Sequence, residues 1–127
     1  RAFALQKKAA KSGFDWPEEQ GILDKIREEV AELETEMARG DRLAEEEELG
    51  DLLFSLVNLA RRRGLDPDSA LTGTNRKFAA RFRHIESEAR RLGRPLETLS
   101  LEEMDRYWEE AKRSTVGLEG GPDKLQE

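Results

Sequence analysis

Apolar side chains recur at helical spacing along most of the chain, and no segment alternates as a half-buried strand would. We therefore expect an all-α fold, a helical bundle of about five helices. The predicted helices cover roughly residues 2–11, 17–38, 42–63, 67–92 and 101–113. The second helix carries an apolar stripe at Ile22, Ile26, Val30, Leu33 and Met37. This spacing is typical of a helix that faces a core.

Several predicted helix ends carry residues with known capping roles. Gly13 is expected to supply the left-handed cap that ends the first helix. Asp66 and Pro67 suit the N-cap and the first helical position of the fourth. Ser100 and Glu103 form the S-x-x-E pattern of a capping box, which predicts where the last helix begins.

The third predicted helix carries apolar residues on a broad face, with Phe54 on its opposite side. We expect this helix to be central and covered from two directions. Only 36% of the residues are hydrophobic, so one subunit has little apolar material to cover its own core. The sequence therefore predicts one domain over residues 1–113, whose four-helix-bundle-like core is completed by dimerisation. The glycine-rich remainder, residues 114–127, is expected to be a disordered tail.

A short acidic pattern occurs twice, first with Glu29 and Glu32, then with Glu48 and Asp51. Gly40 lies midway between Glu32 and Glu48. It also lies midway between Glu29 and Asp51. If two antiparallel helices meet at Gly40, a rise of about 1.5 Å per residue sets the paired carboxylates at matching heights. The four carboxylates are then predicted to share one small volume.

Crowded carboxylates repel one another and resist burial unless they are neutralised. A hard divalent cation with oxygen ligands neutralises them, so the sequence predicts a magnesium site, with manganese as an alternative ion. The competing interpretation is an ordinary solvated acidic helix face. A di-iron bundle would need Glu-x-x-His pairs, and the one histidine, His84, has no acidic residue three positions before it.

Helical angles rank the acidic residues as ligands. At about 100° per residue, Glu29 lies only about 20° outside the apolar stripe of its helix, with Glu32 about 60° further round. Glu28 points further toward solvent, so Glu29 and Glu32 are the better candidates. Glu45 lies one turn before Glu48, and three roles are open to it. It could bind the metal, accept a hydrogen bond from a ligand, or act as the base for an attacking water.

Charge is divided unevenly along the chain. Residues 28–51 contain eleven acidic and two basic side chains, whereas residues 76–94 contain seven basic and two acidic ones. This division suits an anionic ligand that carries a metal ion, with cations for its phosphates and carboxylates for the ion. Long nucleic acid is disfavoured because the acidic face would repel it.

The basic segment and the last helix supply candidates for substrate binding. Lys77 and Arg81 lie one turn apart and could clamp phosphate, or they could be solvated charges. Asn75 interrupts an apolar stripe. It could contact the substrate, or it could be a polar group that fixes helix register. Trp108 could stack on a base or belong to the core.

No cysteine is present, which excludes disulfides and thiolate metal sites and makes a cytoplasmic location the expectation. No apolar run approaches the length of a membrane span, and no signal peptide is visible. We therefore expect no membrane partner. The chain begins at Arg1 rather than Met, so the sequence leaves open whether another segment precedes it.

Six segments carry a resemblance to a known family. They are L-Q-K-K-A-A-K-S-G-F-D-W (5–16), K-I-R-E-E-V-A-E-L (25–33), E-E-E-L-G-D-L-L-F (46–54), V-N-L-A-R (57–61), N-R-K-F-A-A-R-F-R (75–83) and Y-W-E-E-A-K-R (107–113). In these segments the chain resembles MazG nucleoside triphosphate pyrophosphohydrolases. It looks most like the C-terminal, catalytic half of the two-domain members.

This resemblance implies an all-α fold that dimerises into an intertwined bundle. It also implies magnesium-dependent hydrolysis of nucleoside triphosphates to monophosphate and pyrophosphate. Metal binding is carried over to Glu29, Glu32, Glu48 and Asp51. Substrate contacts are carried over to Lys77, Arg81 and Trp108.

The expected function is therefore removal of standard or non-standard ribo- or deoxynucleotides from the nucleotide pool. A carboxylate such as Glu45 or Glu48 is expected to hold the attacking water. The alternative, from another functional class, is a non-catalytic helical regulator that senses a nucleotide or docks onto a partner protein.

Overall fold

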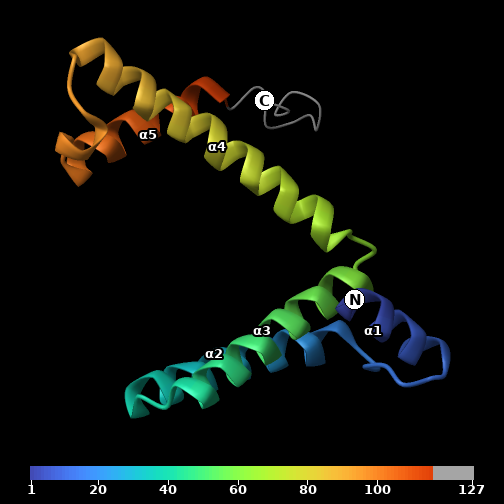
Figure 1. The fold of residues 1–127 in the computed structure, drawn as a ribbon. Helices are drawn as coiled ribbons and strands as arrows, with labels where there is room; N and C mark the ends of the chain where they lie inside the picture. Colours follow the sequence, from blue (N-terminus) through green and yellow to red (C-terminus); the bar gives the residue numbers. More distant parts are fainter. Residues whose placement is uncertain (116–127) are drawn as a thin grey trace. The chain divides into compact units, whose positions relative to one another are not determined.

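Every regular element of the described chain is helical, which confirms the all-α prediction. The structure, a computed structural model, describes residues 1–115 (Figure 1). Its helices are α1 (Ala2–Lys11), α2 (Glu19–Arg39), α3 (Arg42–Arg62), α4 (Pro67–Leu92) and α5 (Leu101–Thr115), and a 3₁₀ turn, η1, covers Leu96–Thr98. The described chain divides into two compact units, Arg1–Pro67 and the described residues from Asp68 onward.

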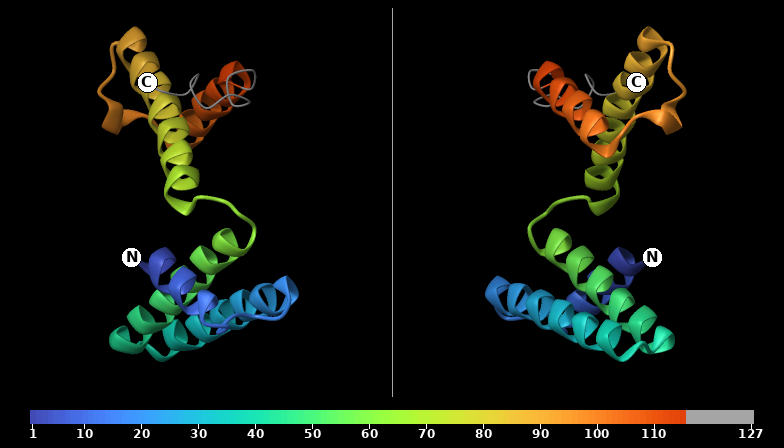
Figure 2. Two further views of the ribbon diagram at one scale, coloured as in Figure 1. Left: turned by 90° about the vertical axis from the view of Figure 1, so that its right-hand side faces the viewer. Right: turned by 90° about the vertical axis from the view of Figure 1, so that its left-hand side faces the viewer.

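In the first unit, α2 and α3 form an antiparallel hairpin whose helices lie side by side (Figure 2). Gly40 ends α2 in the left-handed conformation, with φ of 74°, and its N–H donates to the carbonyls of Glu36 and Met37. Asp41 caps α3 by accepting a hydrogen bond from the N–H of Ala44 at 3.2 Å. The predicted turn is thus confirmed, and it sets the two acidic patterns against each other.

Helix α3 contacts both α1 and α2, which confirms its central place in this unit. However, none of the described residues of α3 is fully buried. Several of its leucines remain exposed to solvent: the exposed fractions of Leu49, Leu53 and Leu56 lie between 45% and 55%. Two neighbouring helices cover only part of the circumference of α3, so the broad apolar face predicted from sequence is only partly covered within the unit.

The second unit is built from α4, η1 and α5. The predicted capping box is confirmed, because Ser100 Oγ accepts from the N–H of Glu103 at 3.0 Å and the N–H of Ser100 donates to Glu103 Oε1 at 2.8 Å. Gly93 follows α4 with a left-handed φ of 68°. The core of the unit is formed by Ile85, Ala89, Leu99 and Tyr107.

The boundaries of three helices differ from the predictions, that of α3 by one residue, since it ends at Arg62. Helix α2 begins at Glu19, two residues late, because Glu18 has an extended backbone. Helix α5 continues to Thr115, two residues into the predicted tail; the rest of that tail, residues 116–127, lies outside the described residues. The turn η1 was not predicted, since three residues are too short to show a period. None of the described helices has the length and apolar character to cross a membrane.

Candidate functional site

In the hairpin, Glu29 and Glu28 of α2 differ in burial, as the helical angles predicted. The side chain of Glu29 is 2% exposed and faces α3, whereas that of Glu28 is 56% exposed. Ile22 shares this face of α2 two turns earlier and is buried too. A carboxylate in this position needs a partner.

Two overlapping groups of carboxylates form around Glu29. Glu29, Glu48 and Asp51 each offer an oxygen atom, and these atoms lie within 4.8 Å of one another. Glu28, Glu29 and Glu32 form a second group by the same measure. The structure thus places all four sequence-predicted ligands in one acidic cluster, with Glu29 as the shared member. Glu28, which the angular argument set aside, joins the second group.

The free oxygens of the cluster fit a hard cation. Glu29 Oε2 and Glu48 Oε2 are buried and have no hydrogen-bond partner among the described residues. A buried carboxylate oxygen without a partner is costly. An all-carboxylate donor set suits magnesium or manganese better than a softer metal. Glu29, Glu32, Glu48 and Asp51 are therefore the residues that would hold such an ion.

The pKa of Glu48 reflects the crowding of the carboxylates. Burial raises the pKa of Glu48 to about 7, together with its hydrogen bond to Glu32 and the charges of Glu32, Glu29 and Asp51. At neutral pH the cluster therefore shares its negative charge with a proton, and a bound cation would replace that proton.

Lys25, which the sequence argument did not single out, is the basic partner of the cluster. Its Nζ lies 2.8 Å from Glu28 Oε1 and 3.0 Å from Glu29 Oε1. Hydrogen bonds to Glu28 and Glu29 raise the pKa of Lys25 above its usual range. The i, i+4 spacing of Lys25 and Glu29 was a signal that could have revealed this contact.

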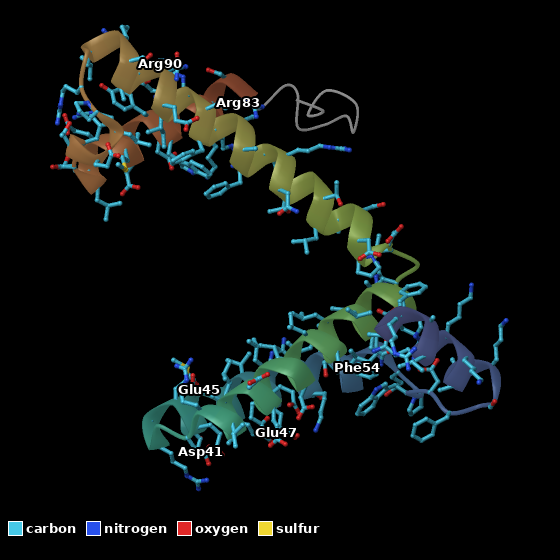
Figure 3. All side chains as sticks on the ribbon, in the orientation of Figure 1. Asp41, Glu45, Glu47, Phe54, Arg83 and Arg90 are labelled. Atoms are coloured by element: carbon cyan, nitrogen blue, oxygen red, sulfur yellow. The ribbon has the colours of Figure 1, made fainter. Side chains whose placement is uncertain are left out.

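Glu45 lies near the hairpin end of α3, close to Asp41 (Figure 3). Its carboxylate is half-buried, and Oε2 lies 4.0 Å from Arg42 Nη1. Within the described part of the chain, Glu45 joins neither of the two carboxylate groups. Its candidate role as a base stays a prediction.

The predicted substrate-binding residues all belong to the second unit. Arg81 is buried, 8% exposed, and its guanidinium carbon lies 5.5 Å from the ring centroid of Trp108. The Trp108 ring also packs against Phe78, with centroids 5.4 Å apart. Arg81 is thus not the solvated charge that one interpretation suggested. Lys77 is half-buried and Asn75 is exposed, and their contacts to substrate stay predictions.

Comparison with known proteins gives consistent matches. A family described as "MazG nucleotide pyrophosphohydrolase domain" matches residues 18–86. The chain is 46% identical over 108 residues to the nucleoside triphosphate pyrophosphohydrolase/pyrophosphatase MazG of Thermotoga maritima, covering 85% of the chain and 41% of that protein. It is 40% identical over 120 residues to the nucleoside triphosphate pyrophosphohydrolase of Escherichia coli K12, covering 93% and 46%. The chain thus spans less than half the length of these relatives.

Proposed function

Because the chain belongs to the MazG nucleotide pyrophosphohydrolase family, we propose that it hydrolyses nucleoside triphosphates to nucleoside monophosphates and pyrophosphate. The observation that carries this proposal is the pair of buried, unpartnered oxygens, Glu29 Oε2 and Glu48 Oε2, within the carboxylate cluster. Such an arrangement suits an enzyme whose substrate brings a divalent ion with its phosphates.

Magnesium is the proposed ion, with manganese as an alternative, held by Glu29, Glu32, Glu48 and Asp51. When bound, it would polarise the phosphate oxygens and offset the charge that develops on them. Lys25 keeps one oxygen of Glu29 engaged, at 3.0 Å, and leaves the other free. This contact fixes the direction of the buried carboxylate.

Two carboxylates are candidates for holding the attacking water. The pKa of Glu48 is raised to about 7 without a metal ion, and a bound ion would lower it, so Glu48 would then be ionised and able to accept a hydrogen bond from that water. Glu45 lies one turn earlier on α3 and is partly open to solvent. The positive side chains of Lys77 and Arg81 are proposed to bind the departing pyrophosphate.

We also propose that the protein works as a homodimer. The support is the open apolar face of α3, at Leu49, Leu53 and Leu56, which one copy leaves about half exposed. Exposed apolar residues grouped on one helix are typical of an interface. Sedimentation should therefore give a mass of at least two chains at micromolar concentration.

The test of the reaction is product identification. The protein is incubated with magnesium and each nucleoside triphosphate, without added pyrophosphatase, and the products are separated by chromatography. Monophosphate with pyrophosphate is expected, and a chelator should abolish its formation. Diphosphate with free phosphate would refute the proposed bond cleavage. Binding without any product would favour the regulator alternative.

A further inference from the structure

Helices α4 and α5 of the second unit pack together through its small apolar core (Figure 2). Trp108 of α5 packs against this core but is only half-buried. Its ring contacts Phe78 of α4, with centroids 5.4 Å apart, and Phe78 is itself 59% exposed. An apolar contact that solvent reaches from one side restrains a ring less than enclosed packing does. The position of the Trp108 ring therefore depends on what fixes α5.

One pair of polar side chains joins the two helices beside Trp108. Nε2 of His84 on α4 lies 3.1 Å from Oε1 of Glu110 on α5. An ionised carboxylate can only accept a hydrogen bond, so Nε2 is the nitrogen that donates. The imidazole also meets the ring of Tyr107 edge-on, with centroids 6.3 Å apart and planes at 81°. His84 is thus held by two residues of α5 that lie one helical turn apart.

A second contact fixes the same helix two turns earlier. Arg94, which follows α4, donates to Glu103 of α5 at 2.8 Å. Glu103 precedes Glu110 by seven residues, so the two carboxylates lie on nearly the same side of α5, about 20° apart. Arg94 alone would restrain only the first turns of α5, whereas contacts at both positions oppose its rotation and its tilting. Trp108 lies close to the second contact, two residues before Glu110.

The position of the Trp108 ring matters because the ring lies beside Arg81, whose guanidinium carbon is 5.5 Å from the ring centroid. A guanidinium over an indole face is attracted to it. Arg81 precedes His84 by three residues, so the two side chains are neighbours along α4. This contact and that of His84 are therefore one turn apart between the same two helices. A rotation of α5 that breaks the His84 contact also moves the indole relative to the guanidinium.

We propose that His84 and Glu110 are positioning residues, whose hydrogen bond holds α5 so that the Trp108 ring stays against Arg81. The inference rests on the proposed function, in which Arg81 binds the departing pyrophosphate. His84 and Glu110 act through the ring of Trp108 and are not catalytic residues. When α5 is loosened, the guanidinium samples more orientations, and fewer of them suit the pyrophosphate.

The first test removes the hydrogen bond from either side. Glu110→Met keeps the length of the side chain but has no acceptor oxygen. His84→Phe keeps a ring against Tyr107 but has no donor. In each variant kcat/KM for ATP with magnesium should fall about 3- to 10-fold, the range expected for the loss of one partly exposed hydrogen bond. The double variant should be no worse than either single one, because the two changes remove the same contact.

Two matched variants serve as controls for turnover. Glu110→Gln keeps an acceptor oxygen without the charge, so it should retain most of the wild-type kcat/KM. Glu109→Met makes the same change as Glu110→Met at the exposed neighbouring position of α5, and it should turn over ATP normally. Rescue by glutamine at position 110 would not be expected if only the negative charge of α5 mattered.

A spectroscopic measurement separates positioning from a general loss of stability. The chain has two tryptophans, so labelling with 5-fluorotryptophan gives two ¹⁹F resonances, and Trp108→Phe identifies the one from Trp108. This resonance should shift or broaden in Glu110→Met and His84→Phe and stay close to its wild-type position in Glu110→Gln. The resonance of Trp16, which belongs to the first unit, should be the same in all of them. Thermal melting verifies that each variant is folded.

Calorimetry with pyrophosphate and magnesium measures binding without turnover, and the affinity should weaken together with kcat/KM. An unmoved Trp108 resonance in both Glu110→Met and His84→Phe would overturn the inference, whether or not activity fell. A moved resonance with wild-type kcat/KM and wild-type pyrophosphate affinity would overturn it as well. If wild type released no monophosphate and pyrophosphate, the proposed function would fail. The resonance and the pyrophosphate affinity would then still decide the positioning role.

Discussion

The ammonium group of Lys25 lies 3.0 Å from Oε1 of Glu29, a carboxylate whose side chain is only 2% exposed. Lys25 itself is 40% exposed, so the pair joins a buried charge to a partly solvated one. The other oxygen of Glu29 has no hydrogen-bond partner among the described residues. Without a metal ion, Lys25 is thus the cation that makes the burial of Glu29 tolerable.

Lys25→Met should therefore make the protein depend more strongly on magnesium. Removing the lysine leaves the Glu29 carboxylate without its counter-charge and should cost about 1–2 kcal/mol of unfolding free energy, less than for a fully buried pair because Lys25 is partly exposed. A bound ion should restore much of this loss by stabilising the folded state. Thermal melting with chelator and with saturating magnesium measures both effects. The exposed Lys8→Met serves as the control, and an equal gain from magnesium in both variants and wild type would contradict the expectation.

Glu48→Gln should abolish most activity while the fold persists. The substitution keeps size and helix propensity but removes a carboxylate charge from the cluster. Turnover should fall at least about 100-fold, beyond the roughly 10- to 100-fold typical of residues that only orient metal ligands. Calorimetry should show weaker magnesium binding.

Glu28→Gln is the matched comparison, because Glu28 lies on the same cluster but is mainly solvent-exposed. Its loss of turnover should be much smaller than that of Glu48→Gln. Equal losses would mean that the exposed group formed by Glu28, Glu29 and Glu32 binds the ion as strongly as the group formed by Glu29, Glu48 and Asp51.

The raised pKa of Glu48 predicts how stability depends on pH. Its folded-state value, about 7, exceeds the ordinary value of 4.5, so between these limits the folded state binds more protons than the unfolded state. Without metal, the contribution of Glu48 to the unfolding free energy should fall as pH rises from about 4.5 to about 7, then level off. Denaturation with chelator across this range should show a smaller fall in Glu48→Gln than in wild type. Magnesium should release protons on binding near pH 6.5 and bind more tightly above about pH 7.

The acidic cluster was predictable because local signals define it. Gly40 fixes the reversal of the chain through its left-handed backbone, and helical angles then decide which carboxylates face the partner helix. The burial of Glu29 and the exposure of Glu28 follow from these two facts alone. The capping box at Ser100 was predictable for the same reason, since its partners are three residues apart.

The packing of α1 and of the loop before α2 against α3 was not predictable, because it depends on contacts between distant segments. Gln6 bonds to the carbonyl of Phe54, 48 residues away, and Arg61 reaches Asp15 across 46 residues. No periodicity within α1 or α3 specifies how these helices meet. The leucines on α3 stay about half exposed within the unit, since a stripe shows that a face is apolar but not which chain covers it.

The last prediction concerns Lys77 and Arg81 on α4. A hydrogen bond to a charged group is worth about 1.5–3 kcal/mol, so Lys77→Ala should lower kcat/KM for triphosphates about 10- to 100-fold if the ammonium binds phosphate. Arg81→Lys should also lose activity, since the guanidinium lies over the Trp108 ring at 5.5 Å and a lysine cannot reproduce its planar fork. Magnesium binding should be unchanged in both variants.

Arg90→Ala provides the control for that experiment, because Arg90 is an exposed cation near the end of the same helix (Figure 3). It should turn over triphosphates normally. Because Arg81 is buried, melting temperatures must be compared as well, and a loss of activity that accompanied unfolding of Arg81→Lys would leave Lys77→Ala to decide. Normal turnover in Lys77→Ala, with folding intact, would show that its ammonium is not the group that holds the leaving pyrophosphate.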